Sequence, residues 1–173
     1  MKKLPNRRLF LGATLLTGAA LTWPLAALAQ DARPSRLQLT VSGKIGVTQQ
    51  DGRVVFDRTK LEALPQKTFT TQTPWDDKPT RFSGPLLRDI LTAVQAQGTQ
   101  IKAIALNDYK VTIPVADSQK YDMVLALRMN GDLMSIRTKG PFFIVYPFDS
   151  APELRSSTYY SRSIWQLKAI EVE

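Results

Sequence analysis

Residues 105–145 decide the fold through three segments: Ala105-Leu106-Asn107-Asp108-Tyr109, Leu125-Ala126-Leu127-Arg128-Met129-Asn130-Gly131 and Arg137-Thr138-Lys139-Gly140-Pro141-Phe142-Phe143-Ile144-Val145. Asn130-Gly131 lies between apolar runs, which is a strong sequence signal for a β-hairpin turn. Asn107-Asp108 marks a second turn, followed by residues 109–113, which alternate between polar and apolar. Pro141 opens a further strand, where its missing N–H does least harm. The stretch therefore predicts short strands joined by tight turns.

The rest of the chain predicts more strands around this stretch. Alternation and turn residues favour strands at residues 36–42, 67–73, 80–83, 101–106, 110–113, 124–129, 133–136, 142–146 and 164–172. Residues 43–56 are expected to form a hairpin around Gln50-Asp51-Gly52, because Asp-Gly suits positive φ. Residues 148–161, which include Tyr159-Tyr160, are expected to form a long polar loop.

Few helices are expected. Asp57 is suited to cap a short helix over residues 58–64. The longest helix should begin at Gly84-Pro85, with Pro85 in its first turn, and should end at Gly98. A brief helical turn is expected at residues 117–121. The pattern predicts an α+β fold class, mainly β, in a single domain.

Residues 1–29 predict an export signal rather than part of the fold. Four basic residues precede an apolar run at 9–25, and Ala27-Leu28-Ala29 is typical of a cleavage site. Asn6-Arg7-Arg8-Leu9-Phe10-Leu11 indicates a twin-arginine-like signal peptide. An ordinary secretory signal and an uncleaved membrane anchor are the alternatives. We expect a mature domain of residues 30–173 in the periplasm.

Composition limits the chemistry. The 173 residues include no Cys and no His, which excludes thiol and imidazole nucleophiles and imidazole metal sites. Residues 30–173 hold 19 basic and 15 acidic residues, a net charge of +4 that does not indicate nucleic-acid binding. Most carboxylates fall at predicted turns, where Asp commonly accepts bonds from nearby backbone N–H groups. No residue is therefore predicted to be a metal ligand.

Four motifs in order give the chain a family resemblance. They are Ala105-Leu106-Asn107-Asp108-Tyr109, Leu125 to Gly131, Lys139-Gly140-Pro141 and Ile164-Trp165-Gln166-Leu167. With these, residues 37–172 resemble the molybdopterin-binding domain of the sulfite oxidase family. The resemblance implies that fold, a molybdopterin cofactor and an oxidoreductase activity.

The motifs depart from that family at its cofactor contacts. The family's molybdenum-binding Cys should fall near residues 72–75, where this chain has Gln72-Thr73-Pro74-Trp75. The family's His before the Gly and Pro is Lys139, the Arg after that Pro is replaced by Phe142-Phe143, and the Lys before its Trp is Ile164. The scaffold motifs remain while the metal and pterin contacts are lost, a pattern that favours a kept fold with a changed function.

Six residues are the candidate binding site. Arg137 and Lys139 flank a turn whose backbone N–H groups are suited to hold an anion, with Arg88 and Asn107 behind them. The resemblance places Trp75 and Trp165 near the cofactor site, where with Tyr109 they would line a cleft. The alternatives are solvated cations and aromatic side chains that belong to the core. Arg88 is expected to reach inward to a carboxylate such as Asp108, and the loop at 148–161 is the second place to look.

The function predicted first is an exported binding or accessory module with a degenerate cofactor site, for which a membrane sensor is the candidate partner. Its ligand would be a small anionic or polar molecule, or an acidic loop of a periplasmic protein partner. The rival is a molybdopterin-dependent oxidoreductase without Cys ligation, supported by the twin-arginine signal, because that route carries folded, cofactor-loaded proteins. A third possibility is a purely structural partner subunit.

Overall fold

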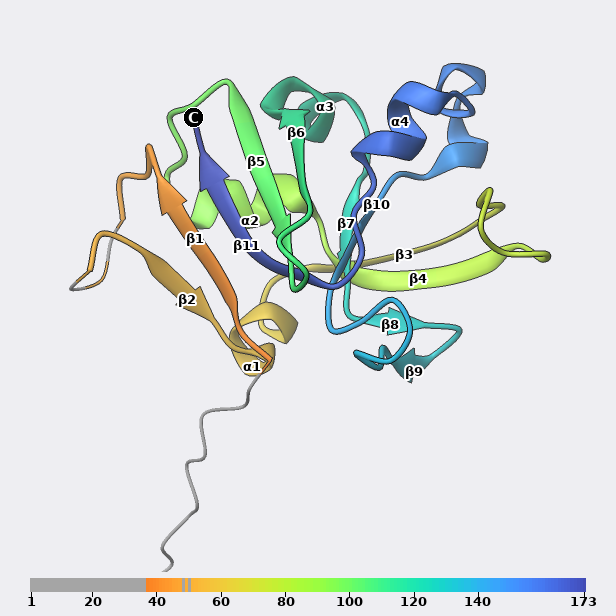
Figure 1. Cartoon of the computed structure of the whole chain (residues 1–173), viewed down its shortest axis with the longest axis horizontal. Helices are drawn as coiled ribbons and strands as arrows, with labels where there is room; N and C mark the ends of the chain where they lie inside the picture. The colour runs from red at the N-terminus through yellow and green to blue at the C-terminus, as the bar shows by residue number, and fades with distance from the viewer. Residues whose placement is uncertain (1–36, 48, 50) are drawn as a thin grey trace, which may run out of the picture. The chain divides into compact units, whose positions relative to one another are not determined.

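The computed structural model describes residues 37–47, 49 and 51–173 (Figure 1). The predicted signal peptide and residues 30–36 of the predicted mature domain lie outside the described residues, as does Gln50 of the predicted turn. The described chain is mixed α/β and mainly β, as the sequence predicts. Its strands form three sheets that share one hydrophobic core.

The largest sheet has five strands in the order β2-β1-β11-β5-β6. Its first and last strands in the sequence are neighbours: β1 (Leu39–Gly43) runs parallel to β11 (Leu167–Val172). The other pairings are antiparallel and involve β2 (Val54–Phe56), β5 (Gln100–Ala105) and β6 (Lys110–Pro114). The predicted turn at Asn107-Asp108 joins β5 to β6, with Asp108 at a φ of 65°.

The remaining strands form a four-stranded sheet, β3-β4-β8-β9, and the pair β10-β7. The Asn130-Gly131 turn is confirmed, because it joins paired strands and both residues have positive φ, 55° and 100°. Gly84 brings β4 against β7, since a Cβ there would lie 1.9 Å from the Leu125 carbonyl oxygen. The strands are β3 (Gln66–Thr71), β4 (Thr80–Pro85), β7 (Val124–Ala126), β8 (Arg128–Met129), β9 (Asp132–Leu133) and β10 (Phe143–Val145).

Helices α1 (Arg58–Glu62) and α2 (Leu87–Ala93) test the helix predictions. Asp57 caps α1 as predicted, accepting a 2.8 Å bond from the Lys60 N–H. The predicted bounds of α2 are wrong: Pro85 is the last residue of β4, and the helix ends at Ala93. Pro85 remains in the strand because pairing with β3 continues through it. Gly98 does not end the helix; its lack of a side chain lets the backbone lie close to the Glu173 carbonyl.

The prediction of a long polar loop at residues 148–161 is wrong. This segment forms two short 3-10 helices, η1 (Phe148–Ser150) and η2 (Pro152–Leu154), and then α4 (Ser157–Arg162). Phe148 and Leu154 are fully buried, so the segment contributes to the core despite its polar composition. In Figure 1 it forms the blue ribbon beside β10, and α4 contacts β6.

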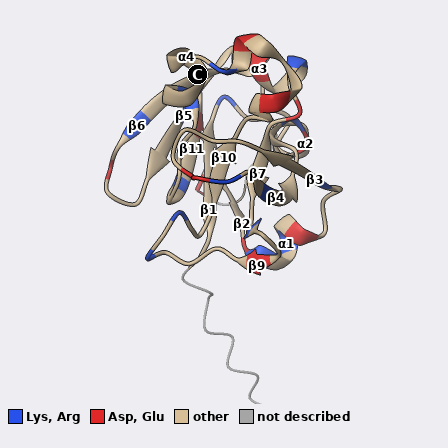
Figure 2. Cartoon of the chain, turned by 90° about the vertical axis from the view of Figure 1, so that its right-hand side faces the viewer, with Lys and Arg blue, Asp and Glu red and all other residues tan. Residues whose placement is uncertain are grey.

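Charges of both signs are interspersed on the surface. Figure 2 shows Lys and Arg scattered among Asp and Glu on the face in view, without one large patch of either sign. Several of the described ion pairs join exposed groups, including Lys67 with Asp122 and Arg53 with Asp51. Within the described part of the chain, none of the helices is long and apolar enough to cross a membrane.

Candidate functional site

Trp75 lies at the centre of an aromatic cluster built from distant segments. Its ring meets those of Phe143, Phe148, Tyr160 and Trp165 at centroid distances of 6.0, 6.0, 6.1 and 5.4 Å. All four contacts are edge-to-face, an arrangement that aromatic pairs favour because ring edges are positive and ring faces negative. Phe143 and Phe148 are buried, whereas Trp165 keeps 38% of its surface exposed. The cluster therefore runs from the core to the surface.

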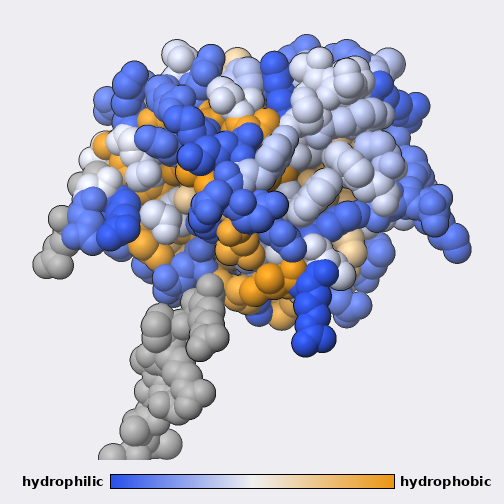
Figure 3. Space-filling model, viewed as in Figure 1, coloured by the Kyte–Doolittle hydropathy of each residue, from blue (hydrophilic) through white to orange (hydrophobic). Residues whose placement is uncertain are grey.

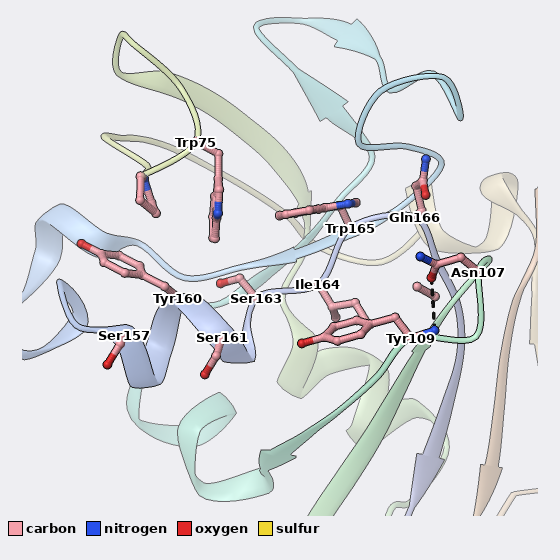
Figure 4. Close-up of a pocket in the computed structure, with 12 residues that line it drawn as sticks. Trp75, Asn107, Tyr109, Ser157, Tyr160, Ser161, Ser163, Ile164, Trp165 and Gln166 are labelled. Carbon is pink, nitrogen blue, oxygen red and sulfur yellow. Dashed lines mark hydrogen bonds between the residues drawn. The ribbon is translucent and has the colours of Figure 1, made fainter.

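A cavity of about 610 Å³ opens beside this cluster (Figure 4). Its aromatic walls are Trp75, Tyr109, Tyr160 and Trp165. Figure 4 shows these rings arranged around a common opening, with Ile164 at the back between Tyr109 and Trp165. Of the described residues, none that lines the cavity carries a charge. Figure 3 shows intermediate hydropathy over the part of this face where Figure 1 places α4.

Polar groups are set between the aromatic walls. Asn107 and Gln166 line one side, and serines 157, 161 and 163 line the other (Figure 4). Asn107 uses its Oδ1 to accept the Tyr109 N–H at 3.1 Å, which leaves its amide NH₂ for a ligand. Gln166 donates from Nε2 to the carbonyl oxygens of Ile136 and Thr138 at 2.8 and 3.2 Å, which leaves Oε1 as an acceptor. The lining thus offers donors and acceptors without charge.

Helix α4, which carries Ser157, Tyr160 and Ser161 into the lining, is held at its far end by a buried carboxylate. Asp117 on α3 (Val115–Lys120) accepts bonds from the Tyr146 hydroxyl at 2.7 Å and from Arg162 Nη1 at 2.8 Å. Burial raises the pKa of the Tyr146 hydroxyl well above its ordinary value, so it remains a proton donor to Asp117. This triad fixes one wall of the cavity.

The segment before Trp75 is fixed by a second carboxylate. Asp149 accepts the Gln72 N–H at 2.7 Å and Arg155 Nη2 at 2.7 Å, and its own N–H donates to Thr71 Oγ1 at 3.0 Å. The Gln72 N–H, which is the largest influence, lowers the pKa of Asp149, and Arg155 adds to the effect. The end of β3 and the start of η1 are therefore joined beside the cavity.

Lys139, a predicted ligand-binding cation, is instead paired with protein. Its Nζ lies 2.5 Å from Asp76 Oδ1, and the two side chains are only 17% and 23% exposed. The second Asp76 oxygen accepts the Thr73 hydroxyl at 2.7 Å. Gln166 also donates its backbone N–H to the Lys139 carbonyl at 3.1 Å. Lys139 therefore attaches the Trp75 loop to the segment before Pro141 and does not line the cavity.

The Arg137 turn does not form the predicted anion cradle. The N–H groups of Arg137, Thr138 and Gly140 all donate to Ser135, the first to its Oγ and the others to its carbonyl. These donors are consumed within the turn, so they do not converge on a ligand. The Arg137 side chain is exposed, away from the cavity lining.

Arg88 reaches a carboxylate, as expected, but the carboxylate is that of Asp122 and not that of Asp108. Arg88 pairs with Asp122 at 2.7 Å, and Asp108 pairs with Lys168 at 2.6 Å. Arg88 leads the influences that lower the pKa of Asp122, and a hydrogen bond from Lys168 leads those that lower the pKa of Asp108. Of the six predicted site residues, the structure brings together Trp75, Asn107 and Trp165, and it places Arg88, Arg137 and Lys139 outside the cavity.

Sequence reasoning missed much of the polar lining. Ser157, Tyr160 and Ser161 lie in the segment 148–161 named as a second place to look, but Ser163 and Gln166 were not named as site residues. Gln166 has a φ of 52°, an uncommon value for a residue other than glycine. Its side chain, like that of Ser163, becomes part of the site only because β11 begins beside the β5–β6 turn.

The residues around the cavity do not fit a molybdenum cofactor. The region of the family's thiolate forms a smaller hollow of about 330 Å³, lined by Gln72, Thr73, Pro74, Asp149, Arg155 and Tyr160. Its side chains offer amide, hydroxyl and carboxylate groups but no soft sulfur ligand, and Asp149 and Arg155 pair with each other. Within the described residues, no cluster of three or more His, Cys, Asp or Glu is placed to hold a metal.

Comparison of the chain with models of known protein families and with curated proteins finds no match.

Proposed function

We propose that the protein is an exported binding or accessory module that takes a small uncharged molecule in the cavity between Trp75 and Trp165. The observation that carries the proposal is the lining of this cavity: four aromatic walls, five polar side chains and no charge. Its volume of about 610 Å³ falls within the range of about 300–1,000 Å³ typical of small-molecule sites. Charged groups near the cavity, among them Lys139 and Asp76, are paired with each other.

The proposal includes the sulfite-oxidase-like fold and a changed function for it. The motif order supports the fold, and the donor set near residues 72–75 argues against molybdenum ligation. The expected result is that native protein, purified after export, carries no stoichiometric molybdenum by elemental analysis. About one molybdenum per chain, with a pterin released on denaturation, would contradict the binding-module proposal and support a molybdopterin-dependent oxidoreductase.

Export through a cleaved signal is part of the same proposal. The support is the basic start, the apolar run and Ala27-Leu28-Ala29. N-terminal sequencing of the periplasmic product should begin near Gln30. Replacing Arg7 and Arg8 by Lys should block export if the twin-arginine route is used, whereas unchanged export indicates the general secretory route.

Binding is tested with the native tryptophans. The sequence has three, at positions 23, 75 and 165, and the last two line the cavity. In protein purified after export, from which cleavage near Gln30 would remove Trp23, a library of small uncharged compounds is screened for changes in tryptophan emission and in thermal midpoint. We expect some compounds to change both, and Trp165→Ala to weaken their binding. If no compound changes either quantity, or if Trp165→Ala binds unchanged, the cavity is not the site.

A further inference from the structure

We infer that the ligand of the Trp75–Trp165 cavity is a neutral carbohydrate, bound by its ring faces and hydroxyl groups. This inference rests on the proposed binding function and names the ligand class for the same cavity. Three features of the cavity carry it: the absence of charge in the described lining, the mixture of free donors and acceptors, and the angles between the aromatic walls.

The first feature selects against charged ligands. Three ionised side chains adjacent in sequence to lining residues are matched, Asp76 with Lys139, Asp108 with Lys168 and Arg162 with Asp117, and a fourth, Lys110 beside Tyr109, is exposed to solvent outside the lining. A carboxylate, sulfate or ammonium ligand would lose hydration on entering the cavity without gaining an opposite charge. An uncharged polar ligand avoids this cost.

The second feature matches hydroxyl groups. Asn107 offers two N–H donors, while Gln166 offers a carbonyl acceptor. Ser161 and Ser163 donate to the carbonyls of Thr158 and Tyr159, at 2.9 and 3.2 Å, and keep their oxygen lone pairs for a ligand. A hydroxyl group both donates and accepts hydrogen bonds, so a polyhydroxylated ligand can bond to the donors and to the acceptors of the lining.

The third feature, the angle between neighbouring aromatic walls, favours a non-planar ring as the ligand. Trp75 meets Trp165 at 78° and Tyr160 at 72°, so neighbouring walls stand nearly at right angles. A flat aromatic ligand can stack on one of two perpendicular faces and meet the other only with its edge. A sugar ring in its chair form presents axial C–H groups on its faces, whose weakly positive hydrogens are attracted to the negative faces of aromatic rings, and hydroxyl groups around its edge, which can bond to the polar side chains between the walls.

Figure 4 shows that the walls leave room for such contacts. Trp165 and Tyr109 lie on opposite sides of the opening, while Trp75 and Tyr160 close a third side. Tyr109 is 54% exposed and Trp165 38% exposed, so both keep faces accessible from solvent. A sugar residue at the end of an oligosaccharide can therefore enter between them with the remaining units outside.

The test is titration of the exported protein, which after cleavage near Gln30 would keep Trp75 and Trp165, with a panel of neutral sugars. The panel holds glucose, galactose, mannose and N-acetylglucosamine with their common disaccharides and trisaccharides. Sugars do not absorb where tryptophan emits, so a shift in emission reports contact with Trp75 or Trp165. Caffeine and nicotinamide serve as flat neutral probes, and sodium sulfate serves as an anionic probe. Isothermal calorimetry measures each dissociation constant.

Two matched variants locate the sugar. Asn107→Asp keeps the oxygen that accepts the Tyr109 N–H and removes the free NH₂ donor, so binding should weaken by about tenfold. Asn130→Asp is the control, because Asn130 likewise uses its Oδ1 on a backbone N–H, that of Arg81 at 3.0 Å, on a turn outside the lining. Its sugar affinity should not change.

Each outcome bears on the inference. A neutral sugar that binds at up to millimolar concentration, with Asn107→Asp weakened and Asn130→Asp unchanged, supports it. Binding of caffeine or nicotinamide without any sugar overturns the carbohydrate inference and leaves the proposed binding function standing. Binding of sulfate at Trp165 overturns the inference that the ligand is neutral. If none of the sugars binds, the carbohydrate inference fails, and the library screen decides the proposed function separately.

Discussion

The Trp75 and Trp165 rings lie 5.4 Å apart at an angle of 78°, although one follows β3 and the other precedes β11. These strands belong to different sheets. The contact therefore forms only when the loop after β3 meets the segment that leads into β11. The candidate site is a consequence of how the sheets assemble, and loss of that assembly should be visible in tryptophan emission.

The two tryptophans should differ in their effect on stability. Trp75 contacts four rings and is half-buried, so Trp75→Ala should cost about 3 kcal/mol of unfolding free energy. Trp165 is 38% exposed, so Trp165→Ala removes less buried apolar surface and should lower the unfolding free energy by only about 1 kcal/mol. Urea denaturation followed by far-UV circular dichroism measures both. Equal costs would contradict the central position assigned to Trp75.

The Lys139–Asp76 pair should show measurable coupling. Both side chains are less than a quarter exposed, so Lys139→Ala leaves a poorly solvated carboxylate, and the coupling in a double-mutant cycle should be about 1 kcal/mol. Lys168 and Asp108 provide the control cycle. Their side chains are 37% and 78% exposed, and their coupling should be below about 0.5 kcal/mol. Similar coupling in the two cycles would argue against a structural role for Lys139.

Asp149 should make stability depend on acid pH. Its pKa is lowered in the folded protein, so its contribution is complete above the unfolded pKa of about 3.9 and is lost as pH falls through the lower folded value. The unfolding free energy should therefore decline below about pH 4. Asp149→Asn should be less stable at neutral pH and should show a smaller decline. An unchanged decline in the variant would exclude this assignment.

Tyr146 should stabilise the α4 wall through its hydroxyl. Tyr146→Phe removes a fully buried bond to Asp117 and should lower the unfolding free energy by about 1–2 kcal/mol. Tyr159→Phe is the matched control, because its hydroxyl makes a longer contact of 3.2 Å with the Tyr121 hydroxyl and Tyr159 itself is only half-buried. Its cost should be below about 1 kcal/mol. A larger loss in the control than in Tyr146→Phe would contradict the importance of the Asp117 triad.

Local features could be predicted from the sequence alone. The Asn130-Gly131 turn and the Asp57 cap depend on residues within a few positions of each other, and both occur where expected. The strand alternation of β1 similarly places Leu39 and Val41 in the core. The mainly β character also follows from such local patterns, because side-chain direction repeats every second residue in a strand.

Contacts between distant segments could not be predicted in this way. Pro85 suits a first helical turn, yet pairing with β3 continues the strand through it. Arg88 meets Asp122 rather than Asp108 because α2 and α3 pack together, whereas Asp108 lies on the β5–β6 turn beside Lys168. These outcomes depend on which elements become neighbours, and local sequence carries little of that information.

The candidate site shows the same division. The sequence indicated that Trp75, Asn107 and Trp165 belong near one cleft, but it also assigned Arg137 and Lys139 to that cleft. Only the tertiary structure paired Lys139 with Asp76, turned the Arg137 amides toward Ser135 and brought α4 to the opening. The physical reason is that backbone conformation is set largely by adjacent residues, whereas a side chain's partner is set by the order and register of strands far apart in the chain.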